Sequence, residues 1–220
     1  MKYIRDPLEI EKNSNKIIDA RLDRGKFDER EWIVVKRVVH ATADFEYARV
    51  MEFSPDAVGK GLSALRRGCR IVTDTRMAEA GINKRLVKDA GCDVRSYGDH
   101  LDVAIISREF GITRAMASMM IAAEEGKNGI FAIGNAPTAL FKLVELVQDG
   151  KVCPDLIIGV PVGLVGAAAS KEALSTISIP YLITRGEKGG SVVAVAIINV
   201  LLSLLSIRPD VNNTNVLKKG

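Results

Sequence analysis

Three short apolar runs, each bounded by glycine or proline and each followed by a helical pattern, constrain the fold of this chain most strongly. They are GIFAIG at 129–134, DLIIGV at 155–160 and ISIPYLIT at 177–184. After the first run, Leu140, Leu143, Val144 and Val147 recur at the spacing of one helix face. Apolar strands that alternate with helices predict a mainly parallel central sheet covered on both faces, which is a three-layer αβα fold of the α/β class.

The chain is long enough for one such domain. It has 220 residues, 47% of them hydrophobic, without an internal repeat or a low-complexity linker, so we expect a single domain over 1–220. Two extra N-terminal helices are predicted over 6–25 and 28–41, before the regular alternation begins near residue 55. The apolar run at 191–206 is shorter than the roughly 20 residues of a membrane-spanning helix, so we expect a buried or subunit-interface helix.

Charge and cysteine content narrow the function classes. The net charge of +4 is spread along the chain without a run of Lys or Arg, which argues against a nucleic-acid arm and suits an acidic small molecule. Cys69, Cys92 and Cys153 form no CxxC pair, so neither a zinc site nor a disulfide framework is indicated. The N-terminal segment is charged and has no secretory apolar region. We therefore expect the protein in a reducing cytoplasm, without a membrane partner.

Three strand-to-helix loops carry residues suited to an anion. They are GNAPTALF at 134–141, GVPVGLVGAAASKE at 159–172 and TRGEKGGS at 184–191. Ligands of parallel sheets bind outside the carboxyl ends of the strands, so we expect the loops to form one crevice lined by N–H groups and cations. In the first loop, Asn135 is expected to cap a helix that starts near Pro137, with free N–H groups facing an anion. Each loop alone could also be an ordinary turn.

The helix predicted over 28–41 delivers a histidine to its end. Ile33, Lys36, Arg37 and His40 share one stripe at helical spacing. His40 could be a surface histidine that the helix C-terminus favours, or a proton donor. In the second case the two cations favour the neutral ring, and bound substrate carboxylates favour the protonated ring. His100 has only solvent-facing neighbours in sequence and looks incidental.

Four other positions are weaker candidates. Arg114 begins a helix after Gly111, so its guanidinium could point into the crevice. Ser14 could be an ordinary serine on a helix surface. Asp44 and Asp74 are expected to cap turns or helices.

Several segments together resemble one family. They are YIRDPLEIEKNS, KRVVHATADFEYA, GITRAMASM, IGNAPTALF, GVPVGLVGAAASKEAL and RGEKGGSVVAVAIIN. In this order they resemble the precorrin-8X methylmutase family, also called cobalt-precorrin-8 methylmutase, over nearly the whole chain. The resemblance implies an isomerase of cobalamin biosynthesis that needs no cofactor, usually a homodimer.

The implied reaction moves a methyl group between adjacent ring carbons, eleven to twelve, of a tetrapyrrole-derived macrocycle. It is a formal 1,5-sigmatropic shift that gives hydrogenobyrinate, or cobyrinate when cobalt is present. The resemblance assigns acid/base catalysis to His40 and substrate binding to Arg37 and Ser14. With the loop residues, the predicted substrate-binding set is Ser14, Arg37, Arg114, Gly134, Asn135, Thr138, Pro161, Gly163, Ser170, Lys171, Arg185, Gly189, Gly190 and Ser191. The separate cations suit a polycarboxylate substrate.

Two positions depart from the usual family run GFVGAAESKE. Leu164 replaces an aromatic residue, which we interpret as a packing change, and Ala169 replaces a carboxylate.

Two other functions remain open. One is a corrinoid carrier, which could lose His40 and still bind its ligand, and the other is a Rossmann-like nucleotide enzyme. The chain contains neither GxGxxG after a strand nor GxxxxGK[ST], which argues against the nucleotide enzyme. Proton transfer from His40 is expected to take place at a cavity formed by the turns near 134, 161 and 186.

Overall fold

A six-stranded sheet forms the centre of the structure, a computed structural model that describes residues 3–126 and 128–206. The strand order is β1-β6-β5-β4-β2-β3. The strands are β1 Met51–Phe53, β2 Arg70–Thr73, β3 Asp93–Ser96, β4 Asn128–Ile133, β5 Leu156–Gly159 and β6 Tyr181–Thr184. All neighbours are parallel except β1, which pairs antiparallel with β6 at one edge. The predicted mainly parallel sheet is therefore confirmed.

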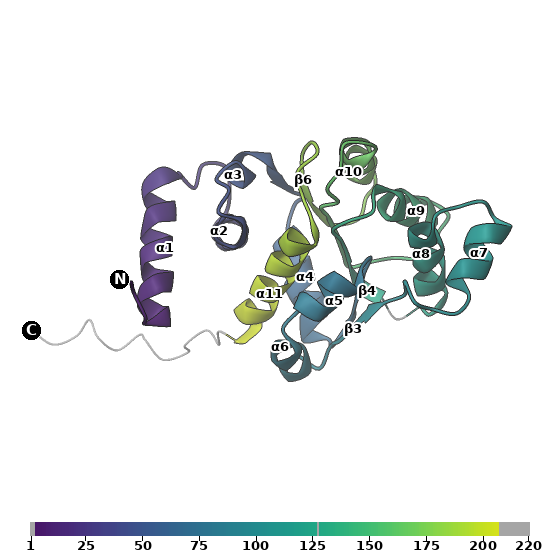
Figure 1. The fold of residues 1–220 in the computed structure, drawn as a ribbon, viewed down its shortest axis with the longest axis horizontal. Helices are drawn as coiled ribbons and strands as arrows, with labels where there is room; N and C mark the ends of the chain where they lie inside the picture. The colour runs from purple at the N-terminus through teal and green to yellow at the C-terminus, as the bar shows by residue number, and fades with distance from the viewer. Residues whose placement is uncertain (1–2, 127, 207–220) are drawn as a thin grey trace, which may run out of the picture.

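Helices cover both faces of this sheet (Figure 1). On one side lie α2 Glu29–Thr42, α4 Ala57–Arg66, α5 Arg76–Gly81, α6 Lys84–Asp89 and α11 Ser191–Ser206. On the other lie α7 Val103–Glu109, α8 Arg114–Glu124, α9 Pro137–Gln148 and α10 Ala167–Ser175. Strand residues alternate between the two cores: Ile130 and Ala132 of β4 belong to the first, and Phe131 and Ile133 to the second. The three-layer αβα architecture follows from this alternation.

The apolar run at 191–206 is the buried helix α11. It packs against α2, α4 and α5, and Ile197, Ile198 and Leu201 are fully enclosed. In the described part of the chain, no helix is long and apolar enough to cross a membrane. Nearby, Met51 of the edge strand β1 is also fully buried.

Of the two N-terminal helices, the first is shorter than expected and the second has the expected length, shifted by one residue. The helix predicted over 6–25 is α1, Pro7–Arg21, capped by the Asp6 side chain, and only Ile18 in it is buried. Helix α2 begins at a reciprocal capping box between Asp28 and Glu31. It ends where Ala43 takes the left-handed conformation, with φ of 53°. A third short helix, α3 Tyr47–Val50, leads into β1 and was not expected.

Candidate active site

The three glycine-rich loops lie side by side, as predicted, at the carboxyl ends of β4, β5 and β6. A Cβ atom on Gly134 would lie 2.8 Å from Cα of Ser191, which joins the first loop to the third. A Cβ atom on Gly189 would lie 2.1 Å from the carbonyl oxygen of Val160, which joins the third loop to the second. These glycines allow backbone to pack directly on backbone, and a larger residue at either position would separate the loops.

The N–H groups of the first loop are bound by the protein's own carboxylate. Asp74, at the end of β2, accepts hydrogen bonds from the N–H groups of Gly134, Asn135 and Ala136 at 3.0, 2.7 and 2.8 Å. The expectation that these groups are free to face an external anion is therefore wrong. Burial raises the pKa of Asp74, and the three N–H bonds oppose that shift. The sequence could not reveal this contact because it joins positions about sixty residues apart.

The start of α9 also differs from the prediction. Ala136, and not Asn135, is the N-cap residue, and no side chain caps this end. Pro137 occupies the first turn as expected. The Thr138 hydroxyl is bonded to that of Thr113 at 3.0 Å, which links the N-termini of α9 and α8. Arg114, the first residue of α8, donates to the Gly98 carbonyl at 2.9 Å.

The second and third loops are joined by a buried lysine. Lys171 is fully enclosed, and its Nζ donates to the carbonyl oxygens of Gly186 and Lys188 at 2.8 and 2.7 Å. Burial lowers the pKa of Lys171 to about 8. A neutral amine still supplies both hydrogen bonds, so the residue can hold the two loops in either protonation state. Ser170, also enclosed, donates to the Ala167 carbonyl at 2.9 Å.

The other cations of the third loop also have partners within the protein. Arg185 bonds both carboxylate oxygens of Glu52 in β1, at 2.7 and 2.9 Å. Lys188 bridges Asp44 and Glu46 at 2.6 and 2.5 Å, and these bonds raise its pKa. The third loop is thereby fastened to β1 and to the turn that follows α2.

The remaining loop residues hold this arrangement in place. Gly163 and Gly190 donate their N–H groups to the carbonyls of Glu187 and Val160, at 3.1 and 2.9 Å. The Ser191 hydroxyl lies 3.2 Å from that of Thr75. Pro161 is buried. The crevice expected at these strand ends is therefore largely filled by polar contacts among the loops themselves.

The stripe predicted on the second helix lines a separate hollow of about 250 Å³. Its lining residues are Glu11, Asn15, Ile33, Lys36, Arg37, His40 and Val200, from α1, α2 and α11. Lys36 pairs with Asp19 at 3.2 Å. Within residues 3–126 and 128–206, the side chains of Arg37 and His40 have no hydrogen-bond or ion-pair partner in the protein. A half-buried imidazole and a free guanidinium thus face the same space.

The hollow and the loops are neighbours, but they do not form one cavity. No residue of the three loops lines the hollow around His40, so the expectation that the turns near 134, 161 and 186 form the cavity of His40 is not met in the single chain. The segment after α2 nevertheless docks on the third loop. Lys188 bonds Asp44 and Glu46, and the Tyr47 hydroxyl donates to the Gly189 carbonyl at 3.2 Å.

Sequence reasoning missed the contribution of α1 beyond Ser14. The Ser14 hydroxyl donates to the Ile10 carbonyl of its own helix at 2.9 Å. Its neighbours Glu11 and Asn15 line the hollow. Their spacing of four residues was a usable signal, because it places both on the same helix face as a polar pair.

The two departures from the family run lie on the surface. Leu164 is 89% exposed, so a packing change at this position does not involve the core of the single chain. Ala169 is also exposed, on α10. Among the residues that the structure describes, no three His, Cys, Asp or Glu side chains are grouped to hold a metal ion.

A parallel sheet with bonded loops at its carboxyl ends, next to a basic hollow with an unpaired histidine, is typical of an enzyme that binds an anionic molecule and moves protons. The sequence model described as CbiC, precorrin-8X methylmutase, matches residues 9–204. The chain belongs to the precorrin-8X methylmutase family.

Individual relatives support the same family assignment. The chain is 46% identical to a cobalt-precorrin-8 methylmutase of Salmonella typhimurium, over 92% of this chain and 97% of the relative. It is 42% identical to one of Priestia megaterium, over 89% and 87%. A crystal structure of precorrin-8X methyl mutase from Thermus thermophilus superimposes with a TM-score of 0.83 at 39% identity, covering 90% of this chain and 96% of that one.

Proposed function

We propose that this chain is an isomerase that moves a methyl group from ring carbon eleven to ring carbon twelve of precorrin-8X or cobalt-precorrin-8, in cobalamin biosynthesis. Family membership and relatives named as methylmutases along almost their full length support this reaction. The structural observation that carries it is the pair His40 and Arg37, whose side chains line one hollow and have no partner among the residues that the structure describes. The same relatives argue against a non-catalytic corrinoid carrier.

His40 is proposed as the acid/base residue. A protonated imidazole gives its proton to the macrocycle, which draws electron density from the migrating centre, and takes the proton back after the shift. General acid catalysis of this kind supplies a factor of about 10²–10⁴. Fixing the ring in its reactive shape supplies much of the remainder.

Arg37 is proposed to bind a substrate carboxylate. It lies on the same stripe of α2 as His40, and its guanidinium is free for a two-point contact. Arg37→Ala is expected to weaken binding by roughly 1.5–3 kcal/mol, which is the strength of a hydrogen bond to a charged group. An absorbance titration measures this loss, and unchanged affinity would refute the contact.

The three loops do not line the hollow around His40, and a macrocycle held there is proposed to extend beyond the hollow to reach them. Their N–H groups and cations are already bonded within the protein, so the loops are proposed to form a rigid surface beside the substrate. Substrate contacts by Ser14, Arg114, Thr138, Arg185 and Ser191 remain predictions.

We also propose a homodimer in the cytoplasm. The tip of the second loop exposes Val162, Leu164 and Val165 at 46%, 89% and 88%, an apolar surface that a second copy could cover. The sequence indicates no disulfide framework, which suits a reducing compartment. Leu164→Asp should shift the sedimentation of purified protein towards the monomer, and an unchanged dimer would show that the tip is not the interface.

The direct test of the reaction uses purified protein with metal-free and cobalt-containing substrate in parallel. The rearranged ring has a different conjugated system, so turnover should change the visible spectrum. Conversion of either substrate supports the proposal and identifies the form used. Tight binding of both without conversion would favour the carrier.

A further inference from the structure

Two cysteines lie side by side at the amino ends of neighbouring strands. Each follows a glycine and precedes a strand: Cys69 before β2 and Cys92 before β3. The strands are parallel, with Arg70 paired to Asp93, so the residues before them are also neighbours. The two Gly-Cys turns are in contact, because a Cβ atom on Gly68 would lie 2.8 Å from the Gly91 carbonyl oxygen. Neighbouring residues of adjacent parallel strands lie at a separation that a disulfide can span.

The surroundings of the two thiols are closely packed, and the Cys92 thiol donates to the Leu65 carbonyl at 3.4 Å. On the β4 side of Cys69 there is no spare room, since a Cβ atom on Gly129 would lie 2.4 Å from the Cys69 Cβ. The neighbouring Cys92 thiol raises the pKa of Cys69, and burial adds to the shift. The neighbouring Cys69 thiol lowers the pKa of Cys92. The Cys92 sulfur is thus the better nucleophile, and Cys69 is the partner next to it.

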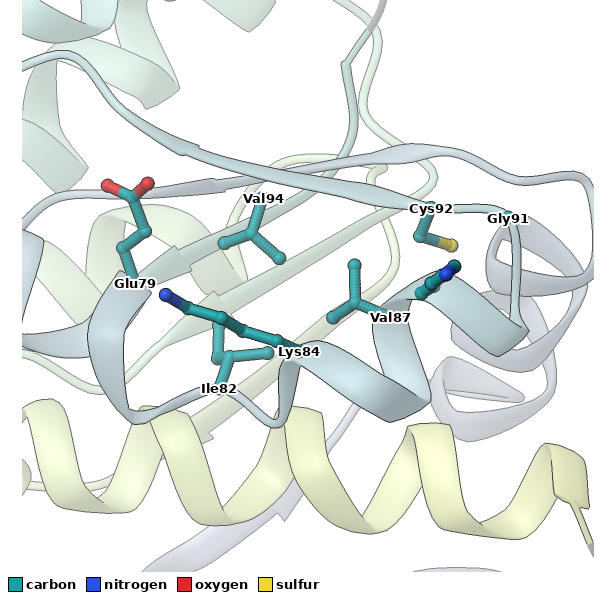
Figure 2. Close-up of a pocket in the computed structure, with 8 residues that line it drawn as sticks. Glu79, Ile82, Lys84, Val87, Gly91, Cys92 and Val94 are labelled. Carbon is teal, nitrogen blue, oxygen red and sulfur yellow. The ribbon is translucent and has the colours of Figure 1, made fainter.

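Cys92 is also open to a small reagent. It lines a cavity of about 420 Å³ together with Ile82, Val87, Val94 and Lys84. Figure 2 shows the Cys92 sulfur towards one end of this cavity and the Glu79 carboxylate at the other, with the two valines between them. Lys84 and Lys88 in the lining favour an anionic molecule.

We propose that Cys69 and Cys92 are a redox-active dithiol, which a small anionic disulfide such as glutathione disulfide converts into an intramolecular disulfide. The Cys92 thiolate attacks one sulfur of the reagent, forms a mixed disulfide and releases one glutathione thiolate. Cys69 then loses its proton to solvent, attacks the Cys92 sulfur and releases the second glutathione thiolate. Two protein thiols are oxidised, one external disulfide is reduced to two thiols, and the protein thiol protons pass to solvent.

This modification site is separate from the proposed active site. Cys69 and Cys92 lie at the amino ends of β2 and β3, whereas the three loops lie at the carboxyl ends of β4, β5 and β6. The new bond would fasten the edge strand β3 to β2 and close the loop through α5 and α6. The proposal does not depend on the methylmutase reaction.

The test equilibrates the full chain with glutathione buffers of increasing oxidation, traps free thiols by alkylation in acid and maps the peptides. We expect a Cys69–Cys92 cross-linked peptide, and a fall from three alkylated cysteines to one, with only Cys153 retaining its label. The melting temperature of the oxidised chain should rise by roughly 6–12 °C, because the cross-link restricts the unfolded state by about 3 kcal/mol.

Single cysteine variants test whether Cys69 and Cys92 are the two residues that form the cross-link. Cys69→Ser and Cys92→Ser should abolish both the cross-link and the thermal shift, whereas Cys153→Ser, at an exposed position outside the pair, should retain both. If the parent chain shows only mixed disulfides with glutathione, or keeps all thiols free at every ratio, the proposal is overturned. The parent chain gives this answer even if a variant fails to fold.

Discussion

Asp74→Asn tests the organisation of the first loop most sharply. The carboxylate accepts one N–H bond on Oδ1, from Gly134, and two on Oδ2, from Asn135 and Ala136. An amide keeps one acceptor oxygen and turns an NH₂ group towards at least one of these donors. The best arrangement retains the two bonds of Asn135 and Ala136 and leaves the Gly134 N–H facing another donor.

The expected loss of stability in Asp74→Asn follows from these hydrogen bonds. One lost hydrogen bond to a charged acceptor costs about 1.5–3 kcal/mol, and the two retained bonds weaken because their acceptor becomes neutral. Removing a buried charge offsets part of this loss, since burial raises the pKa of Asp74. We therefore expect a net destabilisation of about 3 kcal/mol, or a melting temperature lower by roughly 6–12 °C.

Urea unfolding followed by far-UV circular dichroism measures this change. Asp89→Asn is the matched control, because the same chemical change occurs at an exposed residue whose pair with Arg85 is 3.8 Å long. The free energy of unfolding of this control should lie within about 0.5 kcal/mol of the value for the parent chain. If Asp74→Asn is as stable as Asp89→Asn, the carboxylate does not organise the loop.

Two further predictions concern the loops. Burial lowers the native pKa of Lys171 to about 8, below the roughly 10.4 of an unfolded lysine, so between these values the unfolded chain binds more protons. Stability should therefore rise with pH from about 8 to 10 in the parent relative to Lys171→Met, as measured by urea unfolding, and parallel profiles would contradict the shift. Gly189→Ala would place a Cβ atom 2.1 Å from the Val160 carbonyl oxygen and should destabilise the fold by about 3 kcal/mol or more. Gly98→Ala, whose nearest contact is 3.9 Å, should change little, and equal stability of the two variants would contradict the close packing.

The sheet was predictable because its signal is local. The runs that became β4, β5 and β6 are apolar and bounded by turn residues, which is what a doubly covered parallel strand requires. The antiparallel pairing of β1 could not be predicted, since three residues carry little pattern and their direction is set by tertiary contacts with β6.

One part of the candidate site, the placement of Arg37 and His40, was predictable in the same way. The helical period placed Arg37 and His40 on one stripe, and both line one hollow. The partners of Lys171, Asp74 and Arg185 depend on contacts across loops distant in sequence, so the prediction treated bonded groups as free ones. A charged residue in a glycine-rich loop can hold that loop as readily as it binds a ligand.

The acid role of His40 is tested most directly by single turnover of His40→Ala with bound substrate, using the form that the parent converts. The rate of methyl migration should fall by about 10²–10⁴, while the affinity measured by absorbance titration stays within about tenfold. His100→Ala, at an exposed histidine outside the hollow, is the control and should turn over like the parent. Normal migration by His40→Ala would contradict the proposed proton transfer.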